Sequence, residues 1–458
     1  MKPLNVLLVA YSFPPAGGVG VLRAASLARY FPAEGIRLDV LTTRNASAVG
    51  TDSALLKEIP TEVLIHRTVT LDLPFGIKKR IKKLITGGEP SGGPTAASVT
   101  TGKPNFLKRV LQDLLLPDPQ VTWLPVLARA ARSIVRKRKI DLVLITVPPF
   151  SSVLLVEKLR AEFPRLPIVV DFRDEWLSTT IDLVSFSRSK RAQQVARIAE
   201  ASAVANATGI VAVTEAARRE ICARYHEEPD GKFHLIPNGF DVASMNGLTP
   251  FVASRPGSSD KILIAYVGSI YGSTEPSSLV QALQSLPGDV KSRFKLRFIG
   301  HIEEPRFREA LLQLGEMVEL MGFLPQNEAL AAMREADYAL LITHDSLNVA
   351  AKFYDYIGAG KPILATIQPE GEVRRLLEEM RAGWWADSRD VKAIQKLFIE
   401  AAARGDARRN EFHPDTEKIA QYERKALAQR YAALLHSISE NQSLDLQSLG
   451  AQPAGKGE

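Results

Sequence analysis

Cysteine is almost absent from this sequence, since Cys222 is the only one in 458 residues. A single cysteine excludes an internal disulfide and a cysteine-rich metal site, and it suits a protein of the reducing cytoplasm. Long apolar runs are also absent: no stretch reaches about 18 apolar residues, so we predict no segment that spans a membrane by itself. The brief apolar run near the N-terminus reads as a strand and a turn rather than a signal peptide. We therefore predict a cytoplasmic location.

Metal-binding and dinucleotide-binding patterns are missing too. The seven histidines show no metal-ligand spacing, and no Asp-x-Asp pair follows a strand. We therefore predict no metal and no other cofactor. Gly18 and Gly20 fit the start of a dinucleotide fingerprint, but Arg23 stands where its third glycine should be. The second strand also ends without the acidic residue that would hold a ribose, which argues against a hydride-transfer enzyme.

Positive charge is in excess, with a formal net charge of +7. This excess favours anionic partners such as sugar nucleotides, anionic lipids or nucleic acid. The basic residues are partly clustered in residues 75–88, where apolar side chains recur at helical spacing. A basic amphipathic helix of this kind suits peripheral contact with an anionic membrane, at its inner face, although a solvated helix with a small core-facing stripe explains it equally. We expect no nucleic-acid partner.

Apolar strand-like runs alternate with helical patterns, which favours an α/β fold with parallel sheets covered by helices. Each half of the chain opens with an apolar strand, a glycine-containing loop and a helix. Two such nucleotide-type units would share a site between them. The expected strands are 4–11, 36–43, 140–147, 166–172, 208–214, 232–238, 262–269, 294–300, 318–323, 338–343 and 362–367. The expected organisation is an N-terminal domain (1–245, insertion about 75–105), a C-terminal domain (260–412), a C-terminal helix (413–438) and a disordered tail (439–458).

Residues 337–367 are the most informative segment, because they read as strand, polar loop, short helix, glycine stop and strand. Lys352 lies in the first turn of that helix, where the helix dipole disfavours a cation. A bound phosphate would reverse this cost, since free N–H groups and an ammonium would converge on it. Asp355 lies one turn further and is suited to a ribose diol. An ion pair between Lys352 and Asp355 on a solvated helix is the alternative.

Two other segments place polar or flexible residues at strand ends. Gly17 and Gly18 allow a ligand to approach the backbone closely at a helix start, with a tight turn as the alternative explanation. Arg173 and Asp174 follow a strand, where they suit contact with an acceptor hydroxyl or a sugar. An arginine–aspartate pair that joins two loops explains them as well.

Several short motifs occur in order along nearly the whole chain. They are PPAGGVG, PPFSS, DFRDEW, AVTEAARREI, IPNGFD, YVGSIYG and KFYDYIGAGKP. In this order they resemble the family-4-like, GT-B-fold retaining glycosyltransferases of bacterial cell-surface polysaccharide biosynthesis. The resemblance implies two Rossmann-like domains that face each other across a cleft, with the acceptor on the N-terminal side and the nucleotide-diphosphate sugar mostly on the C-terminal domain. It also implies a metal-independent transfer of the sugar, with retention, to a carbohydrate or lipid-linked acceptor.

The resemblance also assigns roles to individual residues. It places Lys352 at the donor diphosphate and Asp355 at the ribose. It places Gly17 and Gly18 in the loop near phosphate and acceptor. Arg173 and Asp174 stand in the region where many members carry a catalytic histidine and an aspartate.

Two departures from the family pattern matter. The first of the family's two glutamates is replaced by Leu347, so Asp345 or Asn348 would have to serve the donor instead. Where many members have an arginine after the Val-Gly of the second domain, this chain has Ser269. Diphosphate binding would then depend on Lys352 and on the backbone from Gly268 onward. A non-catalytic nucleotide-binding or scaffold protein and a sugar-nucleotide epimerase remain as alternatives.

Overall fold

The computed structural model describes residues 3–44, 51–70, 115–178, 189–242, 261–410 and 412–450, with backbone alone for 404–410 and 442–450. The predicted insertion at 75–105, its basic helix at 75–88 and the end of the tail lie outside the described residues. The predicted domain boundary between 245 and 260 lies outside them as well. Within the described ranges, no helix combines the length and the apolar character needed to cross a membrane.

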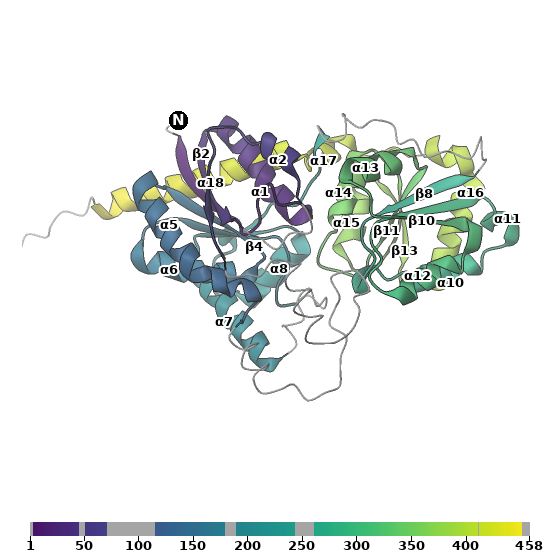
Figure 1. The fold of residues 1–458 in the computed structure, drawn as a ribbon, viewed down its shortest axis with the longest axis horizontal. Coiled ribbons are helices and arrows are strands. Elements are labelled where there is room, and N and C mark those ends of the chain that lie inside the picture. Colours follow the sequence, from purple (N-terminus) through teal and green to yellow (C-terminus); the bar gives the residue numbers. More distant parts are fainter. Residues whose placement is uncertain are drawn as a thin grey trace, which may run out of the picture.

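Two parallel sheets with helices on both faces form two α/β units (Figure 1). The first sheet has seven strands in the order β3-β2-β1-β4-β5-β6-β7. Its strands are β1 (Leu4–Val9), β2 (Ile36–Thr43), β3 (Leu64–Thr68), β4 (Leu142–Val147), β5 (Ile168–Phe172), β6 (Gly209–Ala212) and β7 (Phe233–Leu235). Its helices are α1 (Val19–Tyr30), α2 (Ser53–Lys57), α5 (Leu124–Arg138), α6 (Leu154–Glu162), α7 (Lys190–Asn206) and α8 (Glu215–Arg224).

The second sheet has six strands in the order β10-β9-β8-β11-β12-β13. Its strands are β8 (Ile262–Val267), β9 (Phe294–Ile299), β10 (Val318–Gly322), β11 (Tyr338–Ile342), β12 (Ile363–Ile367) and β13 (Gly383–Asp387). Its helices are α10 (Ser277–Gln284), α11 (Gly288–Lys291), α12 (Pro305–Leu312), α13 (Gln326–Glu335), α14 (Ala351–Gly358), α15 (Glu372–Glu379) and α16 (Val391–Asn410). All pairs of neighbouring strands in both sheets are parallel, which confirms the predicted fold class.

The central strands are mostly apolar because helices cover both faces of each sheet. Every residue of β4, β11 and β12 is buried. The strand order reverses between β1 and β4 in the first sheet and between β8 and β11 in the second. Ligands of open parallel sheets bind outside the carboxyl ends of the strands at such reversal points. The fold therefore indicates two candidate positions for a ligand.

Two stretches of chain pass between the units, and they pair with each other. Phe240 and Glu423 form a parallel bridge, in which the Phe240 N–H donates to the Tyr422 carbonyl over 3.1 Å. Gly239 is required at this contact, because an added Cβ would lie 2.0 Å from the Tyr422 oxygen. The Asn-Gly turn of the IPNGFD motif is thus a close backbone approach at the passage between the units.

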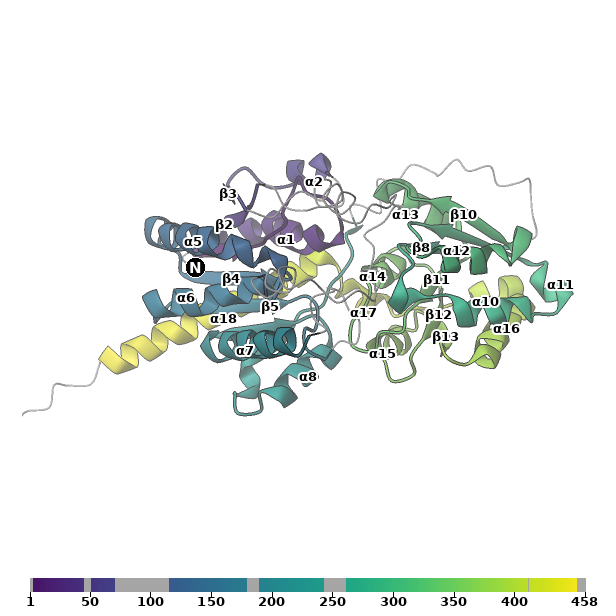
Figure 2. The same cartoon turned by 60° about the horizontal axis from the view of Figure 1, so that its bottom comes forward.

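The C-terminal helices α17 (Thr416–Ala420) and α18 (Arg424–Gly450) return the chain to the first unit, along which α18 runs in Figures 1 and 2. Leu427, Tyr431 and Leu435 of α18 are buried in the core on one face of the first sheet. The prediction of a helix end at 438 and disorder from 439 is wrong up to Gly450. No glycine or proline interrupts the sequence between 424 and 449, so nothing local ends the helix earlier.

Candidate active site

The carboxyl ends of the two sheets face each other. The Glu175 N–H, just after β5, donates to Asn348 Oδ1 over 3.2 Å. The Thr214 hydroxyl, just after β6, donates to the Leu347 carbonyl over 2.7 Å. Both acceptors lie in the loop after β11, so the ligand-binding edges of the two sheets meet at one interface. This is the arrangement that the two glycine-containing halves of the sequence predicted.

Lys352 lies at this interface, in the first turn of α14. The helix begins as predicted, and its N-cap residue Ala350 offers no side-chain hydrogen bond to the free N–H groups. The Lys352 amine donates to the Tyr266 hydroxyl over 2.5 Å and lies 3.9 Å from the centre of the Tyr266 ring. The amine therefore turns inward, onto the end of β8, at the point where the strand order reverses.

No carboxylate in the described part of the chain neutralises this amine. Lys352 and Asp355 form no ion pair, so the alternative of a solvated Lys352–Asp355 pair is wrong. Solvent still reaches part of the side chain, while the surrounding protein disfavours its charged form. Burial lowers the pKa of Lys352 to about 7. An uncompensated cation beside free helix N–H groups is suited to bind an anion.

Gly268 gives the lysine its space. The glycine has a φ of +127°, and an added Cβ would lie 3.0 Å from both Cε and Nζ of Lys352. The next residue, Ser269, accepts a hydrogen bond from the Tyr266 hydroxyl at its carbonyl over 2.8 Å. Tyr266 thus donates to the loop and accepts from the lysine. The sequence analysis placed Lys352, Gly268 and Ser269 together but missed Tyr266, because an apolar strand gives no signal for one tyrosine.

Asp345 and Asn348, the two residues that the sequence analysis offered to the donor in place of Leu347, contact each other, and each already has partners. The Asp345 carboxylate accepts from the Leu347 and Asn348 N–H groups over 2.9 and 3.0 Å, and from Asn348 Nδ2 over 3.0 Å. Asn348 Oδ1 accepts across the interface from Glu175. These two side chains therefore shape the loop beside Lys352 and join it to the first unit.

Arg173 joins two loops of the first unit. Its guanidinium donates to the Gly20 carbonyl, to the Pro148 carbonyl over 2.6 Å and to the Val147 carbonyl over 3.2 Å. These contacts join loops through carbonyl groups, whereas the alternative explanation had joined them through an arginine–aspartate pair. They also place the Gly17–Gly20 loop, in which Gly18 has a φ of +99° and caps α1, beside the end of β5.

Asp174 faces the second unit. Burial raises the pKa of this carboxyl, Arg173 opposes the shift, and Asp345 on the opposite unit raises the pKa further. Asp355 lies apart from this group, where burial raises its pKa to about 6 against the opposing charge of Arg424. The charge of Asp345 thus acts on Asp174 across the interface, whereas no described contact joins Asp355 to the lysine amine.

Arg23 explains the broken dinucleotide fingerprint. Its guanidinium forms a bidentate pair with buried Asp171 at 2.9 and 3.0 Å, and it donates to the Ile236 and Pro237 carbonyls over 2.7 Å each. It also donates to the Tyr431 hydroxyl of α18 over 2.9 Å. Burial alone would lower the pKa of Arg23, but Asp171 and Tyr431 outweigh burial and raise it. The arginine at the third-glycine position is thus structural.

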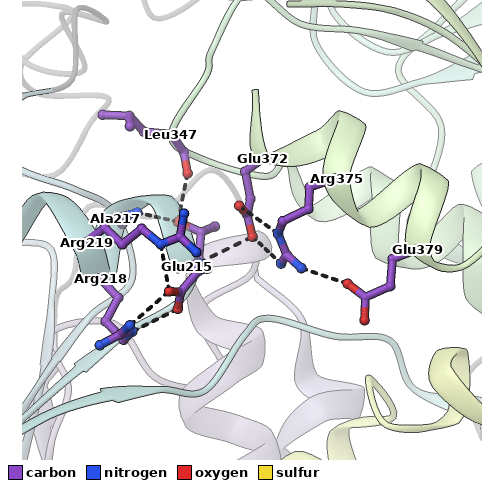
Figure 3. Close-up of polar contacts among 9 residues, drawn as sticks. Glu215, Ala217, Arg218, Arg219, Leu347, Glu372, Arg375 and Glu379 are labelled. Carbon is purple, nitrogen blue, oxygen red and sulfur yellow. Dashed lines mark hydrogen bonds and ion pairs between the residues drawn. The ribbon is translucent and has the colours of Figure 1, made fainter. Parts of the chain in front are cut away.

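A row of polar contacts connects α8 and α15 next to the Leu347 loop, as Figure 3 shows. The Glu215 N–H at the start of α8 donates to Glu372 Oε1 of α15 over 3.3 Å. Glu372 is held in turn by Arg375, at 2.6 Å. The sequence analysis missed this contact, since Glu215 lies in the AVTEAARREI motif but nothing in the sequence pairs it with Glu372. It adds a contact between α8 and α15 to the interface.

Within the described residues, no group of three or more histidine, cysteine, aspartate or glutamate side chains is arranged to hold a metal ion. The positive groups at the interface come instead from Lys352 and from the N-terminus of α14. Such a site can hold a diphosphate and stabilise the charge that develops on it when its bond to a sugar breaks.

Comparisons with known proteins agree with this arrangement. Residues 252–418 match the family described as Glycosyl transferases group 1. A relative named as a colanic acid biosynthesis glycosyltransferase, WcaL of Salmonella typhimurium, is 27% identical over 158 residues. That match covers 32% of this chain and 38% of the relative, less than two thirds of the relative's length.

Solved structures show the same fold across most of the chain. Sucrose-phosphate synthase from Thermosynechococcus elongatus aligns with a TM-score of 0.61 at 16% identity, over 95% of this chain and 99% of that one. HepE from Anabaena, in complex with UDP-glucose, aligns with a TM-score of 0.53 at 14% identity, over 97% and 100%. WaaG, a glycosyltransferase of lipopolysaccharide biosynthesis, aligns with a TM-score of 0.54 at 15% identity, over 95% and 98%.

The first unit gives the decisive match: residues 16–244, half of the chain, match the family described as Glycosyltransferase Family 4. The chain therefore belongs to glycosyltransferase family 4 and has the two-unit GT-B fold of that family.

Proposed function

We propose that this chain transfers a sugar from a nucleotide-diphosphate sugar to a carbohydrate or lipid-linked acceptor. The observation that carries the proposal is the Lys352 amine, a half-buried cation at the N-terminus of α14 that has no carboxylate partner among the described residues. Family membership supports the reaction class, and the UDP-glucose complex of HepE supports the class of donor. WcaL is named for colanic acid biosynthesis and WaaG for lipopolysaccharide biosynthesis, and both support a role in polysaccharide biosynthesis.

In this proposal the bond between the anomeric carbon and the diphosphate breaks, and its electron pair stays on the diphosphate. The oxygen of the acceptor hydroxyl forms the new bond to the anomeric carbon, and its proton passes to an oxygen of the leaving diphosphate. Lys352 and the α14 N–H groups stabilise the leaving diphosphate, whose charge increases in the transition state. Asp174, on the opposite unit with a raised pKa, is the carboxylate that we assign to the acceptor side.

Lysine alone does not supply the whole rate enhancement. One charge-assisted hydrogen bond contributes about 1.5–3 kcal/mol, whereas enzymes lower barriers by about 8–23 kcal/mol. The remainder must come from the backbone N–H groups and from positioning of the two substrates between the units. We assign the ribose to Asp355 and the acceptor-side loop to Gly17 and Gly18.

Retention at the anomeric carbon and independence from a metal and from any other cofactor are parts of the same proposal. They rest on the family, and on a site whose positive charge comes from the chain itself. Retention is tested by the anomeric configuration of the product in an NMR spectrum. Metal independence is tested by turnover in excess chelator, where a loss of activity that a divalent cation restores would contradict it.

The direct test is Lys352→Ala. We expect at least a tenfold fall in donor turnover with unchanged thermal stability, measured with a panel of labelled nucleotide sugars and lipid-linked acceptors. Lys361→Ala is the matched control, because Lys361 lies beyond the other end of α14 and donates to the Ala336 carbonyl. Unchanged turnover in Lys352→Ala would contradict the assignment.

One observation favours a second candidate, a nucleotide-binding scaffold without activity. Leu347 replaces the glutamate of the family pattern, and its carbonyl is used in the contact between the units. Nucleotide binding without turnover across the full panel would favour the scaffold. Product formed without any added acceptor would instead indicate a sugar-nucleotide epimerase.

A cytoplasmic location with peripheral contact to the inner face of an anionic membrane is also part of the proposal. It rests on the basic sequence of residues 75–88. Sedimentation with vesicles of anionic lipid at low salt tests it, with neutral vesicles as the control. Failure to sediment with either vesicle would remove it.

A further inference from the structure

A buried group of charges lies beside the turn that follows β5. Arg224, the last residue of α8, donates to Glu175 Oε1 over 2.5 Å and also to Glu200 Oε1 of α7. The side chains of both glutamates are fully buried, and that of Arg224 is 22% exposed. We call these three residues the Arg224 cluster. Two carboxylates share one guanidinium in this cluster, so its net charge is negative when both are ionised.

Glu175 connects the cluster to the candidate active site. Its carboxylate accepts from the Ser178 N–H over 2.5 Å and from the Leu177 N–H over 3.3 Å, so it closes the turn after β5. Its own N–H donates across the interface to Asn348 Oδ1, and Asp174 directly precedes it. The cluster therefore holds the turn that carries the acceptor-side carboxylate and one contact between the units.

Arg224 holds that turn at a second point. Its Nη2, which donates to Glu175, also donates to the Ser178 hydroxyl over 2.8 Å. The Ser178 hydroxyl donates in turn to Glu220 Oε2 of α8 over 3.1 Å. A buried carboxylate that lost this guanidinium would be left as an unpaired charge, which is costly enough to displace it. The position of the turn therefore depends on Arg224.

Glu200 competes with Glu175 for the guanidinium. Its Oε1 also accepts from the Tyr225 hydroxyl over 3.0 Å, but its Oε2 is buried and has no hydrogen-bond partner among the described residues. In the described part of the chain, the charged and titratable groups that face Glu200 are Arg224 and Tyr225 from α8 and Glu175 from the turn. The helix α6 also packs on α7, but its Glu157 accepts from a serine on the exposed side of α7.

A proton on Glu200 leaves Arg224 to Glu175 alone. Burial raises the pKa of Glu200 to about 7; Arg224 and Tyr225 oppose the shift, and the charge of Glu175 adds to it. At lower pH, one guanidinium therefore matches one carboxylate. As the pH rises through this value, a second buried carboxylate ionises and draws on the same guanidinium, which weakens its hold on Glu175.

We propose that Arg224 is a positioning residue of the transfer reaction. Through Glu175 it fixes the turn that carries Asp174, and the protonation of Glu200 sets how firmly it does so. The inference rests on the proposed function, because it takes Asp174 to lie beside the acceptor. A misplacement of about 1 Å can cost about a hundredfold in rate, so the position of this turn matters for the reaction.

The first test follows the Glu175 amide in the ligand-free full chain by NMR, since this amide makes the contact with Asn348. Arg224→Met should shift its signal and speed its hydrogen exchange about tenfold or more, and Arg224→Lys should restore part of the protection. Arg160→Met is the matched control, because Arg160 is a half-buried arginine of the same unit that donates to the Asn206 carbonyl. It should leave the Glu175 amide unchanged. An unchanged amide in Arg224→Met would overturn the inference.

Glu200→Gln is a milder variant that tests the same inference if Arg224→Met does not fold. Glutamine keeps the shape of the side chain and stays neutral. Between pH 6 and pH 8 the Glu175 amide signal should move in the unaltered chain and move much less in Glu200→Gln. Any contribution from the titration of Lys352 is common to both chains. Equal movement in the two chains would overturn the inference.

Turnover separates positioning from general damage. With the nucleotide sugar and acceptor that the unaltered chain uses, Arg224→Met should lower kcat/KM for the acceptor about tenfold or more, whereas Arg160→Met should not. Affinity for UDP or GDP, measured by titration calorimetry, should stay the same in both variants. An equal loss of nucleotide affinity in Arg224→Met, or a displaced amide with full turnover, would overturn the inference and leave the proposed function untouched. If the unaltered chain forms no product with any donor and acceptor of the panel, the proposed function itself fails, and the inference fails with it.

Discussion

Arg23 and Lys352 are two cations beside the facing edges of the two sheets, and their surroundings are opposite. Arg23 has a bidentate carboxylate, two backbone carbonyls and a tyrosine hydroxyl, and its pKa is raised. Lys352 has one hydroxyl and the face of one ring, and its pKa is lowered to about 7. A matched cation holds structure together, whereas an unmatched one is ready for a ligand.

The comparison also separates two arginines and a lysine that sequence motifs treat alike. Arg23 and Arg173 both lie in motifs that suggest phosphate or sugar contacts. Both guanidinium groups nevertheless donate hydrogen bonds to a carboxylate or to carbonyls of the first unit. Among the described contacts, Arg173 donates to three carbonyls of the first unit, whereas the Lys352 amine donates to one hydroxyl. The role of a cationic side chain at this interface therefore depends on the hydrogen bonds that it already makes within the protein, and not on its residue type alone.

The largest expected effect of breaking the matched cation is on stability. Asp171→Asn leaves the buried Arg23 charge without its carboxylate, and we expect a loss of about 3–5 kcal/mol in the free energy of unfolding. Urea unfolding at pH 7 measures it. As a control, Glu304→Gln breaks an exposed ion pair with Arg306 and should change the free energy of unfolding little. Lys352→Met removes an uncompensated charge and should cause no loss of stability. A loss below about 1 kcal/mol in Asp171→Asn would contradict the structural role of Arg23.

We expect a smaller effect from breaking the hydrogen bond between Asn348 and Glu175, which joins the two units beside Lys352. Asn348→Ala removes one hydrogen bond between the units, a contribution of about 0.5–1.5 kcal/mol. We expect a few-fold fall in kcat/KM for the donor, measured by steady-state kinetics, with Gln395→Ala as a control that loses a hydrogen bond within the second unit. A fall of a hundredfold or more would instead show that Asn348 contacts the donor directly.

The fold was largely predictable because its central strands are buried on both faces and read as apolar runs. The two strands that the sequence analysis missed, β3 and β13, are edge strands. All residues of β3 are partly or fully exposed, and so are four of the five of β13, so neither forms an apolar run. The extension of α18 to Gly450 was missed because a polar composition was read as a tail.

The site was predictable only in part. The helix signals placed Lys352 in the first turn of α14, and the glycine signals placed Gly268 beside it. The sequence did not show which hydrogen-bond donors and acceptors already have partners within the protein. Arg173, for example, donates to carbonyls of residues that precede it by more than twenty positions.

The pKa of Lys352 is the most direct test of the central claim. It can be measured by NMR titration of the labelled lysine side chains, with Lys352→Arg to assign the signal, in the free protein and with saturating nucleotide sugar. We predict a pKa near 7 in the free protein, against an ordinary value of 10.5, and a higher pKa with donor bound. Because the amine is already protonated below about pH 7, donor affinity should be full there and fall as pH rises. A pKa near 10.5 in the free protein that the donor does not move would contradict the account.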